Sequence, residues 1–327
     1  MKLKFRELSN DEFELWDAYV EKHPSATCFH STTWLSLVGE NPKVIAAFNK
    51  EELTGGFAYV ETVKNSVKGL HIPPYTQYFS PLFGIEKIES NSYKYENEFL
   101  EGVLILLPKT NHLDFKLPRG HQNILAYNWA GFQSAATITY TINGSLKEYL
   151  KGLNKNKLRE LNKLIKMLEE GDLEVVDDLK PKDWLPLMES TSERGGYNAR
   201  LHKIQSIVEN CPSSMCKKIG LICKEHGLIS FGFFPFDKNA VYNIVNASMR
   251  VDHPVLKTIN LLLLYLAIEF ALNNQKTFDF EGSMLKGVST FNQLMGGTQL
   301  PIYRVQKSPG LVYSILRSIK QIKDDRM

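Results

Sequence analysis

The stretch FDFEGSMLKGVSTFNQLMGG (Phe278–Gly297) places a short apolar strand before a polar loop. Asp279 lies in the middle of the predicted strand, and a glutamate, a glycine and a serine follow at its exit. Two interpretations stay open: a turn with a helix cap, or the lip of a ligand cleft. An earlier stretch, LDFKLP (Leu113–Pro118), has the same order of apolar residue, Asp, Phe and charged residue. The two strands are therefore predicted to be counterparts in a repeat.

The elements around these two strands follow one order, at an offset of about 170 residues. Each half begins with a strand and two helices and continues with two strands joined by a charged turn. A helix then precedes the strand that contains the aspartate. Later strands are predicted at ILAYNWA (124–130) and PIYRVQ (301–306).

This repeat predicts an α/β protein with two similar domains, each a mixed central sheet flanked by helices. The first domain is predicted to span residues 1–144 and the second residues 172–327. A basic helix over residues 145–171 is predicted to join them and to dock against the second. The tail over residues 311–327 has the pattern of a basic amphipathic helix, which fits either peripheral membrane contact or packing on the second domain.

Composition and charge narrow the class of protein. The chain has 327 residues, 43% of them hydrophobic, and a net charge of +3, which does not indicate a general nucleic-acid binder. The most apolar run, residues 259–272, is shorter than the roughly 20 residues of a membrane span and contains Glu269. It predicts a buried helix and no transmembrane segment. The four cysteines form no CxxC pair, so we expect free thiols, no metal site and a cytoplasmic location.

Several segments together carry a resemblance to a known family. They are FHSTTWLSLV, YNWAGFQSAATITYTIN, STSERGGY and FDFEGSMLKGVSTFNQLMGGTQLPIYRV, in an order that covers nearly the whole chain. In these segments the chain resembles the Fem-type (FemABX-like) aminoacyltransferases and related tandem GNAT-like acyltransferases. The resemblance implies two tandem GNAT-like domains. It also implies transfer of an acyl or aminoacyl group from acyl-CoA or aminoacyl-tRNA to an amine on a small molecule or a peptidoglycan precursor, without a tightly bound cofactor.

Two departures from the family pattern keep a second hypothesis open. Fem enzymes with peptidyl-transfer activity have a lysine after a phenylalanine in the segment STFNQLMGG, but here Asn292 follows Phe291. The segment that matches a GNAT pyrophosphate loop, residues 250–262, contains no glycine. The alternative is therefore a binding or scaffold protein that keeps the fold without catalysis.

The candidate residues of the second half form one hypothetical cleft. Glu281 is either a solvent-facing charge or a general base that receives the amine, and Asp279 is the weaker candidate. Ser283 with Gly282 forms either a turn or a pair of oxyanion donors. Tyr242 is predicted to share one strand face with Asn246, as a ligand channel or a polar pair. Arg194 either ends its helix or binds an anionic group.

The remaining candidates also have two interpretations each. Tyr75 and Tyr78 line an acceptor pocket or cover a sheet edge. Lys286 near the Ser283 loop is a substrate-binding candidate. A donor phosphate is predicted to bind at the start of the apolar helix, near Arg250, Lys257 and Thr258. In the basic helix, Lys157 and Arg159 contact tRNA phosphates or belong to a solvated face.

Overall fold

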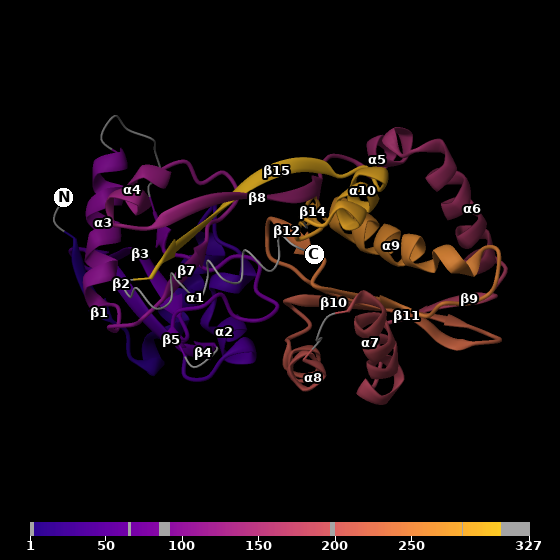
Figure 1. The fold of residues 1–327 in the computed structure, drawn as a ribbon, viewed down its shortest axis with the longest axis horizontal. Coiled ribbons are helices and arrows are strands. Elements are labelled where there is room, and N and C mark those ends of the chain that lie inside the picture. Colours follow the sequence, from indigo (N-terminus) through magenta and orange to yellow (C-terminus); the bar gives the residue numbers. More distant parts are fainter. Residues whose placement is uncertain (1–2, 65–66, 85–91, 197–199, 283, 309–327) are drawn as a thin grey trace. The chain divides into compact units, whose positions relative to one another are not determined.

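The computed structural model describes residues 3–64, 67–84, 92–196, 200–282 and 284–308 (Figure 1). The chain divides into two compact units: unit 1 is Met1–Thr137 with Ile302–Met327, and unit 2 is Ile138–Pro301. The unit boundaries fall inside strands β8 (Gln133–Ile142) and β15 (Thr298–Lys307). The sequence analysis gave all residues after 171 to the second domain. Among the described residues, 302–308 lie in unit 1, because the end of β15 pairs with a strand of that unit.

Unit 1 contains a four-stranded antiparallel sheet with the strand order β1–β2–β3–β6. Its strands are β1 (Lys4–Glu7), β2 (Lys43–Asn49), β3 (Glu52–Tyr59) and β6 (Leu82–Phe83). The first three α-helices of unit 1 are α1 (Phe13–Lys22), α2 (Thr32–Val38) and α3 (Ser92–Leu106). Two short 3₁₀ turns, η1 (Asn10–Glu12) and η2 (Cys28–His30), also belong to this unit.

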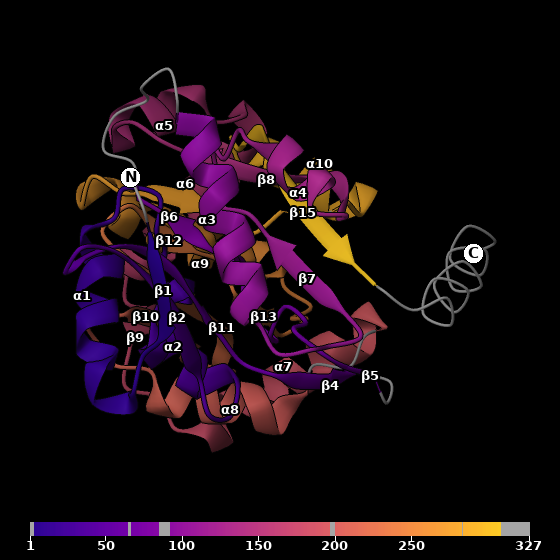
Figure 2. The ribbon, with the colours of Figure 1, turned by 90° about the vertical axis from the view of Figure 1, so that its left-hand side faces the viewer.

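Two adjacent glycines in β3 allow helices to pack closely on both faces of this sheet. Successive residues of a strand point to opposite faces. A Cβ at Gly55 would meet the Phe99 ring of α3, and a Cβ at Gly56 would meet Trp16 of α1. Helices α1 and α3 therefore cover opposite faces of the sheet (Figure 2).

The segment ILAYNWA, which was predicted as a strand, forms helix α4 (Ile124–Trp129). That prediction was wrong because Asn123 starts a helix: its side-chain oxygen accepts a hydrogen bond from the Ala126 N–H at 3.3 Å. The strand of this region begins later, as β8. The other strands of unit 1 are β4 (Thr62–Lys64), β5 (Val67–Gly69) and β7 (Leu113–Lys116).

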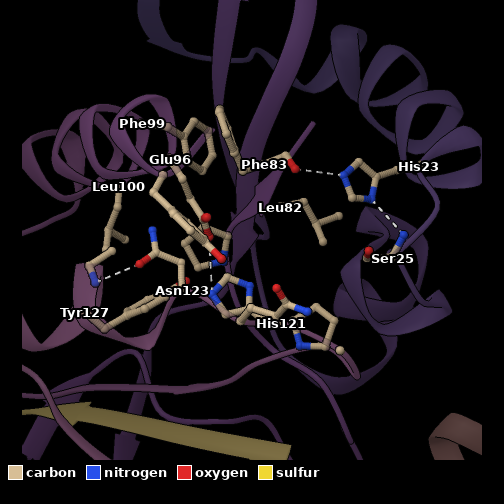
Figure 3. Close-up of a pocket in the computed structure, with 16 residues that line it drawn as sticks. His23, Ser25, Leu82, Phe83, Glu96, Phe99, Leu100, His121, Asn123 and Tyr127 are labelled. Carbon is tan, nitrogen blue, oxygen red and sulfur yellow. Dashed lines mark hydrogen bonds and ion pairs between the residues drawn. The ribbon is translucent and has the colours of Figure 1, made fainter. Parts of the chain in front are cut away.

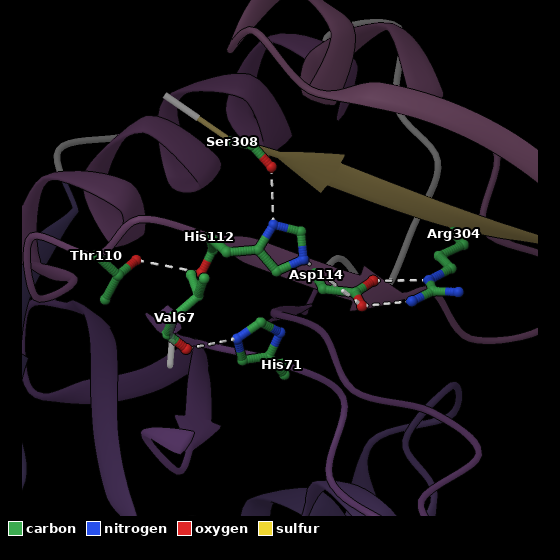
Figure 4. Close-up of polar contacts among 7 residues, drawn as sticks. All are labelled: Val67, His71, Thr110, His112, Asp114, Arg304 and Ser308. Atoms are coloured by element: carbon green, nitrogen blue, oxygen red, sulfur yellow. Dashed lines mark hydrogen bonds and ion pairs between the residues drawn. The ribbon is translucent and has the colours of Figure 1, made fainter. Parts of the chain in front are cut away.

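The buried carboxylate of Asp114 fixes β7 against β15 within unit 1 (Figure 4). Arg304 donates two hydrogen bonds to it, from Nε at 2.7 Å and from Nη2 at 2.5 Å. His112 Nε2 lies 3.9 Å from the same carboxylate, and His112 Nδ1 lies 2.8 Å from Ser308 Oγ. Burial by itself raises the pKa of a carboxyl group, but the hydrogen bonds and charge of Arg304, with a smaller contribution from His112, hold the pKa of Asp114 at about 2.

Unit 2 contains a second antiparallel sheet and a short parallel pair. The antiparallel sheet has the order β13–β11–β10–β9, with β9 (Leu173–Val176), β10 (Cys216–Cys223), β11 (Gly227–Pro235) and β13 (Val245–Ser248). The parallel pair is β12 (Ala240–Tyr242) and β14 (Thr277–Asp279), and β14 also pairs antiparallel with the end of β8.

Helices cover both faces of the antiparallel sheet of unit 2 (Figure 1). Trp184 of α7 stacks on Phe231 of β11 with ring centroids 4.8 Å apart. The next residue, Gly232, leaves room on the other face for Leu263 of α9. The helices of unit 2 are α5 (Leu146–Gly152), α6 (Lys155–Glu169), α7 (Pro181–Gly195), α8 (Leu201–Asn210), α9 (Ile259–Asn273) and α10 (Lys286–Leu294), with the 3₁₀ turn η3 (Leu256–Thr258).

Helix α9 is the centre of the unit 2 core, as the apolar run in the sequence predicted. In the part of the chain that the structure describes, Leu256–Asn273 alone is long and apolar enough to cross a membrane, and 61% of it is buried within the protein. That burial is typical of a core helix rather than of a lipid-facing one.

The basic segment over residues 145–171 forms two helices, not the single helix that was predicted. Ser145 caps α5 and Asn154 caps α6, each by accepting a hydrogen bond from a backbone N–H in the first turn. Leu161 and Leu164 of α6 are buried in the unit 2 core. The segment is therefore part of unit 2.

We expect Asp114→Asn to destabilise the protein by about 1.5–3 kcal/mol, because it removes charge-assisted hydrogen bonds at a buried site. The folded-state pKa of Asp114 is lowered, so its contribution is fully present above the unfolded-state pKa of about 4 and is lost as the pH falls toward about 2. Urea unfolding at pH 7 and pH 3 measures both effects. Glu98→Gln is the matched control, because the Glu98 side chain is 48% exposed and its ion pair with Lys94 is long, at 3.9 Å. This substitution should change stability by less than about 1 kcal/mol. Equal effects of the two substitutions would contradict the prediction.

Candidate functional site

In unit 2, two neighbouring parallel segments separate at Asn243. Strands β12 and β14 pair over three residues, and the last backbone hydrogen bond runs from Asn243 N–H to the Asp279 carbonyl at 2.9 Å. Beyond Asn243, the segment that follows β12 no longer pairs with β14. It forms β13, which pairs with β11 as the edge strand of the antiparallel sheet. The carboxyl ends of diverging parallel strands are a common place for ligands. This strand divergence, residues 242–248 with residues 279–282, is the candidate functional site.

Asp279 holds the exit of β14 in a fixed conformation. Its side chain is fully buried. Its Oδ1 accepts hydrogen bonds from Thr139 Oγ1 of β8 at 2.5 Å and from the Glu281 N–H at 2.9 Å. The carboxylate therefore serves the strand and its turn, as the structural interpretation of Asp279 expects.

Glu281 and Gly282 form a left-handed turn directly after β14. Their φ angles are 63° and 62°, in a region that glycine adopts readily and other residues rarely adopt. A Cβ at Gly282 would overlap the Ile138 carbonyl oxygen and the Thr139 Cα of β8. Glu281 is half-buried at the site. Ser283, the predicted catalytic hydroxyl, lies outside the described residues.

Tyr242 and Asn246 lie on different strands, so the prediction that they share one strand face was wrong. Tyr242 pairs with Asp279 in register, whereas Asn246 lies opposite Gly232 of β11. The strand changes partner between them, which the alternation of side chains in the sequence cannot show. The Tyr242 side chain is fully buried, and its hydroxyl donates to Asp237 Oδ2 at 2.8 Å. Asn246 Nδ2 donates to Asn243 Oδ1 at 3.0 Å.

Arg194 lies in the last turn of α7 and reaches the end of β13. It donates to Ser190 Oγ at 2.6 Å, to Thr191 Oγ1 at 2.9 Å and to the Ser248 carbonyl at 2.6 Å. These contacts tie α7 to the C-terminal end of the edge strand. The hypothesis that Arg194, Glu281 and Tyr242 face one cleft stays a prediction.

The segment between β13 and α9 contains the residues predicted to bind a donor phosphate. His253 Nδ1 accepts hydrogen bonds from the N–H groups of Val255 and Leu256, at 3.2 and 3.1 Å, and so shapes the turn. The Thr258 hydroxyl donates to the Val255 carbonyl at 2.9 Å. Arg250 and Lys257 are both exposed, so the segment between β13 and α9 carries two accessible cations.

The Tyr140 hydroxyl is a feature that the sequence analysis missed. Three side chains contact it: Ser289 Oγ at 2.5 Å, Gln299 Nε2 at 2.8 Å and Gln293 Nε2 at 3.2 Å. These hydrogen bonds, above all that of Ser289, lower the pKa of Tyr140. The partners lie about 150 residues away in the chain, so no local pattern could have indicated the cluster.

The other predicted residues are placed as follows. Tyr78 is fully buried near Phe29, with ring centroids 6.3 Å apart, and Tyr75 is half-buried with a φ of 58°. Lys286 is exposed at the first position of α10. In α6, Lys157 forms an ion pair with Glu160 at 2.6 Å, and Arg159 is exposed.

The described residues contain no metal-binding cluster of three or more His, Cys, Asp or Glu side chains. All four cysteines are buried free thiols. The predicted tail helix, with its proposed membrane contact, lies outside the described residues.

Comparison with solved structures identifies the fold. No protein-family model matches the sequence, and no curated protein matches it. The structure is similar to FemX, with a TM-score of 0.69 and 13% identity over 92% of this chain and 96% of that one. It is similar to a tandem GNAT protein from the clavulanic acid biosynthesis pathway, with a TM-score of 0.52 and 10% identity over 94% of this chain and 99% of that one. It is also similar to L-PGS from Bacillus licheniformis, with a TM-score of 0.54 and 12% identity over 95% of this chain and 96% of that one.

These similarities define the class of fold: the protein has the tandem GNAT-like architecture, with the fold of the Fem-like acyltransferases. The predicted fold class is confirmed. At identities of 10–13%, the similarity applies to the fold alone.

We expect Gly282→Ala to destabilise the protein by more than about 2 kcal/mol. The left-handed conformation costs a side chain about 1–2 kcal/mol, and the new methyl group would overlap the β8 backbone. Gly287→Ala is the matched control, because a Cβ there has nothing within 4 Å and lies in helix α10. It should be neutral or stabilising by up to about 1 kcal/mol. Thermal unfolding of both variants tests this, and similar melting temperatures would argue against a close approach at the strand exit.

Proposed function

We propose that the protein is an acyltransferase that moves an acyl or aminoacyl group from an activated donor to an amine. The observation that carries the proposal is the separation of β13 from β14 in unit 2. It leaves β13 as an edge strand, and the half-buried carboxylate of Glu281 follows at the exit of β14. The tandem GNAT-like fold supports the same chemistry.

The geometry suits a donor with an extended amide-containing arm and a phosphate group. An edge strand offers backbone N–H and C=O groups to an extended ligand, as it would to another strand. The chain then turns through residues 249–258 into α9, whose N-terminus favours an anion. Lys257 and Arg250 are exposed in this segment and add positive charge. Acyl-CoA and aminoacyl-tRNA both fit this description.

The reaction needs few protein groups. The acceptor amine attacks the carbonyl carbon, the C–N bond forms, and the C–S or C–O bond to the donor breaks. The amine loses a proton, and the leaving thiolate or alkoxide takes one. Glu281 is the proposed base, and backbone N–H groups of the edge strand are the proposed donors to the carbonyl oxygen. Orientation of the two substrates supplies most of the remaining acceleration.

We expect Glu281→Gln to lower kcat by about 10²–10⁴-fold, because general-base catalysis contributes that much. The change is isosteric and leaves the backbone N–H that donates to Asp279 in place. Transfer from acetyl-CoA and from aminoacyl-tRNA to a panel of amines is the assay. Glu174→Gln, on the exposed face of β9, is the control and should keep full activity. If the two variants had equal activity, Glu281 would not be the general base.

Donor binding separates an enzyme from a scaffold that has lost catalysis. A ligand that binds only the folded state raises the melting temperature. We expect acetyl-CoA or aminoacyl-tRNA to raise it, and Lys257→Ala to weaken that donor's binding by about 5–10-fold, since it removes one charge contact worth about 1 kcal/mol. Lys182→Ala, at an exposed position of α7, is the control. Absence of stabilisation by both donors would favour the scaffold hypothesis.

A further inference from the structure

Unit 1 contains a cavity of about 240 Å³ that the proposed transfer reaction does not use. At about 30 Å³ per water, it has room for roughly eight water molecules, the size of one small metabolite. The lining comes from the residues just after α1, from β6 and α3, from the segment between β7 and α4, and from α4 itself. All of these elements belong to unit 1.

A carboxylic acid and an imidazole face each other in this cavity (Figure 3). Glu96 Oε1 of α3 lies 3.3 Å from His121 Nε2, and each side chain is 18% exposed. Burial raises the pKa of Glu96 and lowers the pKa of His121. Both shifts have the same origin: the surroundings disfavour a net charge on either group.

Aromatic rings flank this pair. Phe83 and Phe99 have ring centroids 4.9 Å apart, and His121 and Tyr127 have centroids 5.7 Å apart. The His23 ring also lines the cavity: its Nδ1 accepts a hydrogen bond from the Ser25 N–H, and its Nε2 lies 3.2 Å from the Phe83 carbonyl oxygen. Aromatic faces carry negative potential and attract organic cations.

The charge of the lining decides which ligand fits. Among the described residues that line the cavity, Glu96 is the one acidic side chain, and no lysine or arginine is present. An anion would meet a carboxylate and aromatic faces without a cationic partner. A hard metal ion needs several oxygen ligands, which a single carboxylate does not supply. An organic ammonium group, in contrast, would pair with Glu96 and lie against the rings.

We propose that this cavity is a binding site for a small molecule that carries a protonated amine, with Glu96 and His121 as the groups that receive the ammonium. The site is separate from the strand divergence of unit 2. Ammonium binding in this cavity is therefore independent of the proposed transferase activity.

Benzylamine and its neutral analogue benzyl alcohol are matched probes, since they differ mainly in charge. Isothermal titration at pH 7.5 should give a Kd for benzylamine at least tenfold lower than that for benzyl alcohol. Glu96→Gln should weaken benzylamine at least tenfold and leave benzyl alcohol unchanged. Glu98→Gln, an exposed carboxylate on the same helix, should leave both affinities unchanged. Equal binding of the two probes, or equal benzylamine binding by wild type and Glu96→Gln, would overturn the proposal.

The pH dependence of the wild-type protein gives a test that does not rely on a variant folding. The other titratable groups that line the cavity are His23, Tyr93, His121 and Tyr127. As the pH falls, Glu96 takes up a proton at a raised pKa, and the loss of its negative charge weakens ammonium binding. Benzylamine should therefore bind more weakly at pH 5 than at pH 7.5, whereas the affinity for benzyl alcohol should not change. An unchanged benzylamine affinity at pH 5 would also overturn the proposal.

Discussion

The buried carboxylate of Asp279 sets the geometry on which unit 2 depends. It accepts hydrogen bonds from Thr139 on the neighbouring strand β8 and from the Glu281 N–H just beyond its own strand. Because both bonds use one oxygen, the end of β14 and the start of its turn are fixed together. The left-handed turn at Glu281 and Gly282 comes directly after this fixed strand end. With β14 ended there, β13 is left to pair with β11 alone, and the strand divergence results.

In unit 1, a buried aspartate also binds the neighbouring strand, but through a different partner. Asp114 lies in the matching strand β7, is buried, and binds Arg304 of its antiparallel neighbour β15. In each unit, a buried aspartate therefore binds a side chain on the adjacent antiparallel strand. Asp279 accepts a hydrogen bond from a neutral threonine hydroxyl, whereas Asp114 is bound by a guanidinium that outweighs the cost of burying its charge. The repeat preserves the acid and its position but not the partner.

The polar groups of unit 2 differ in how accessible they are to a ligand. Tyr242 is fully buried and bound to Asp237, and the Thr258 hydroxyl is bound within its own turn. Both are therefore better explained as structural groups than as groups that change partner in a reaction. Glu281 is half-buried, and Arg250 and Lys257 are exposed. Because Arg250 and Lys257 are exposed, a ligand can reach them without unfolding the segment that holds them, which is why donor binding is proposed there.

The sequence by itself determined the α/β class, the repeat and the positions of its two aspartates, because strand alternation and helix periodicity are local properties of the chain. It failed where the decisive partner was distant or a cap was overlooked. The cap at Asn123 starts helix α4 where a strand was expected. The hydrogen-bond partner of Asp114 lies 190 residues away in the chain, and that of Tyr140 about 150 residues away. The change of strand partner between Tyr242 and Asn246 and the facing of Glu96 and His121 exist only after the chain has folded. Hydrogen-bond partners and cavities are properties of spatial neighbours, and tertiary packing alone decides which neighbours meet.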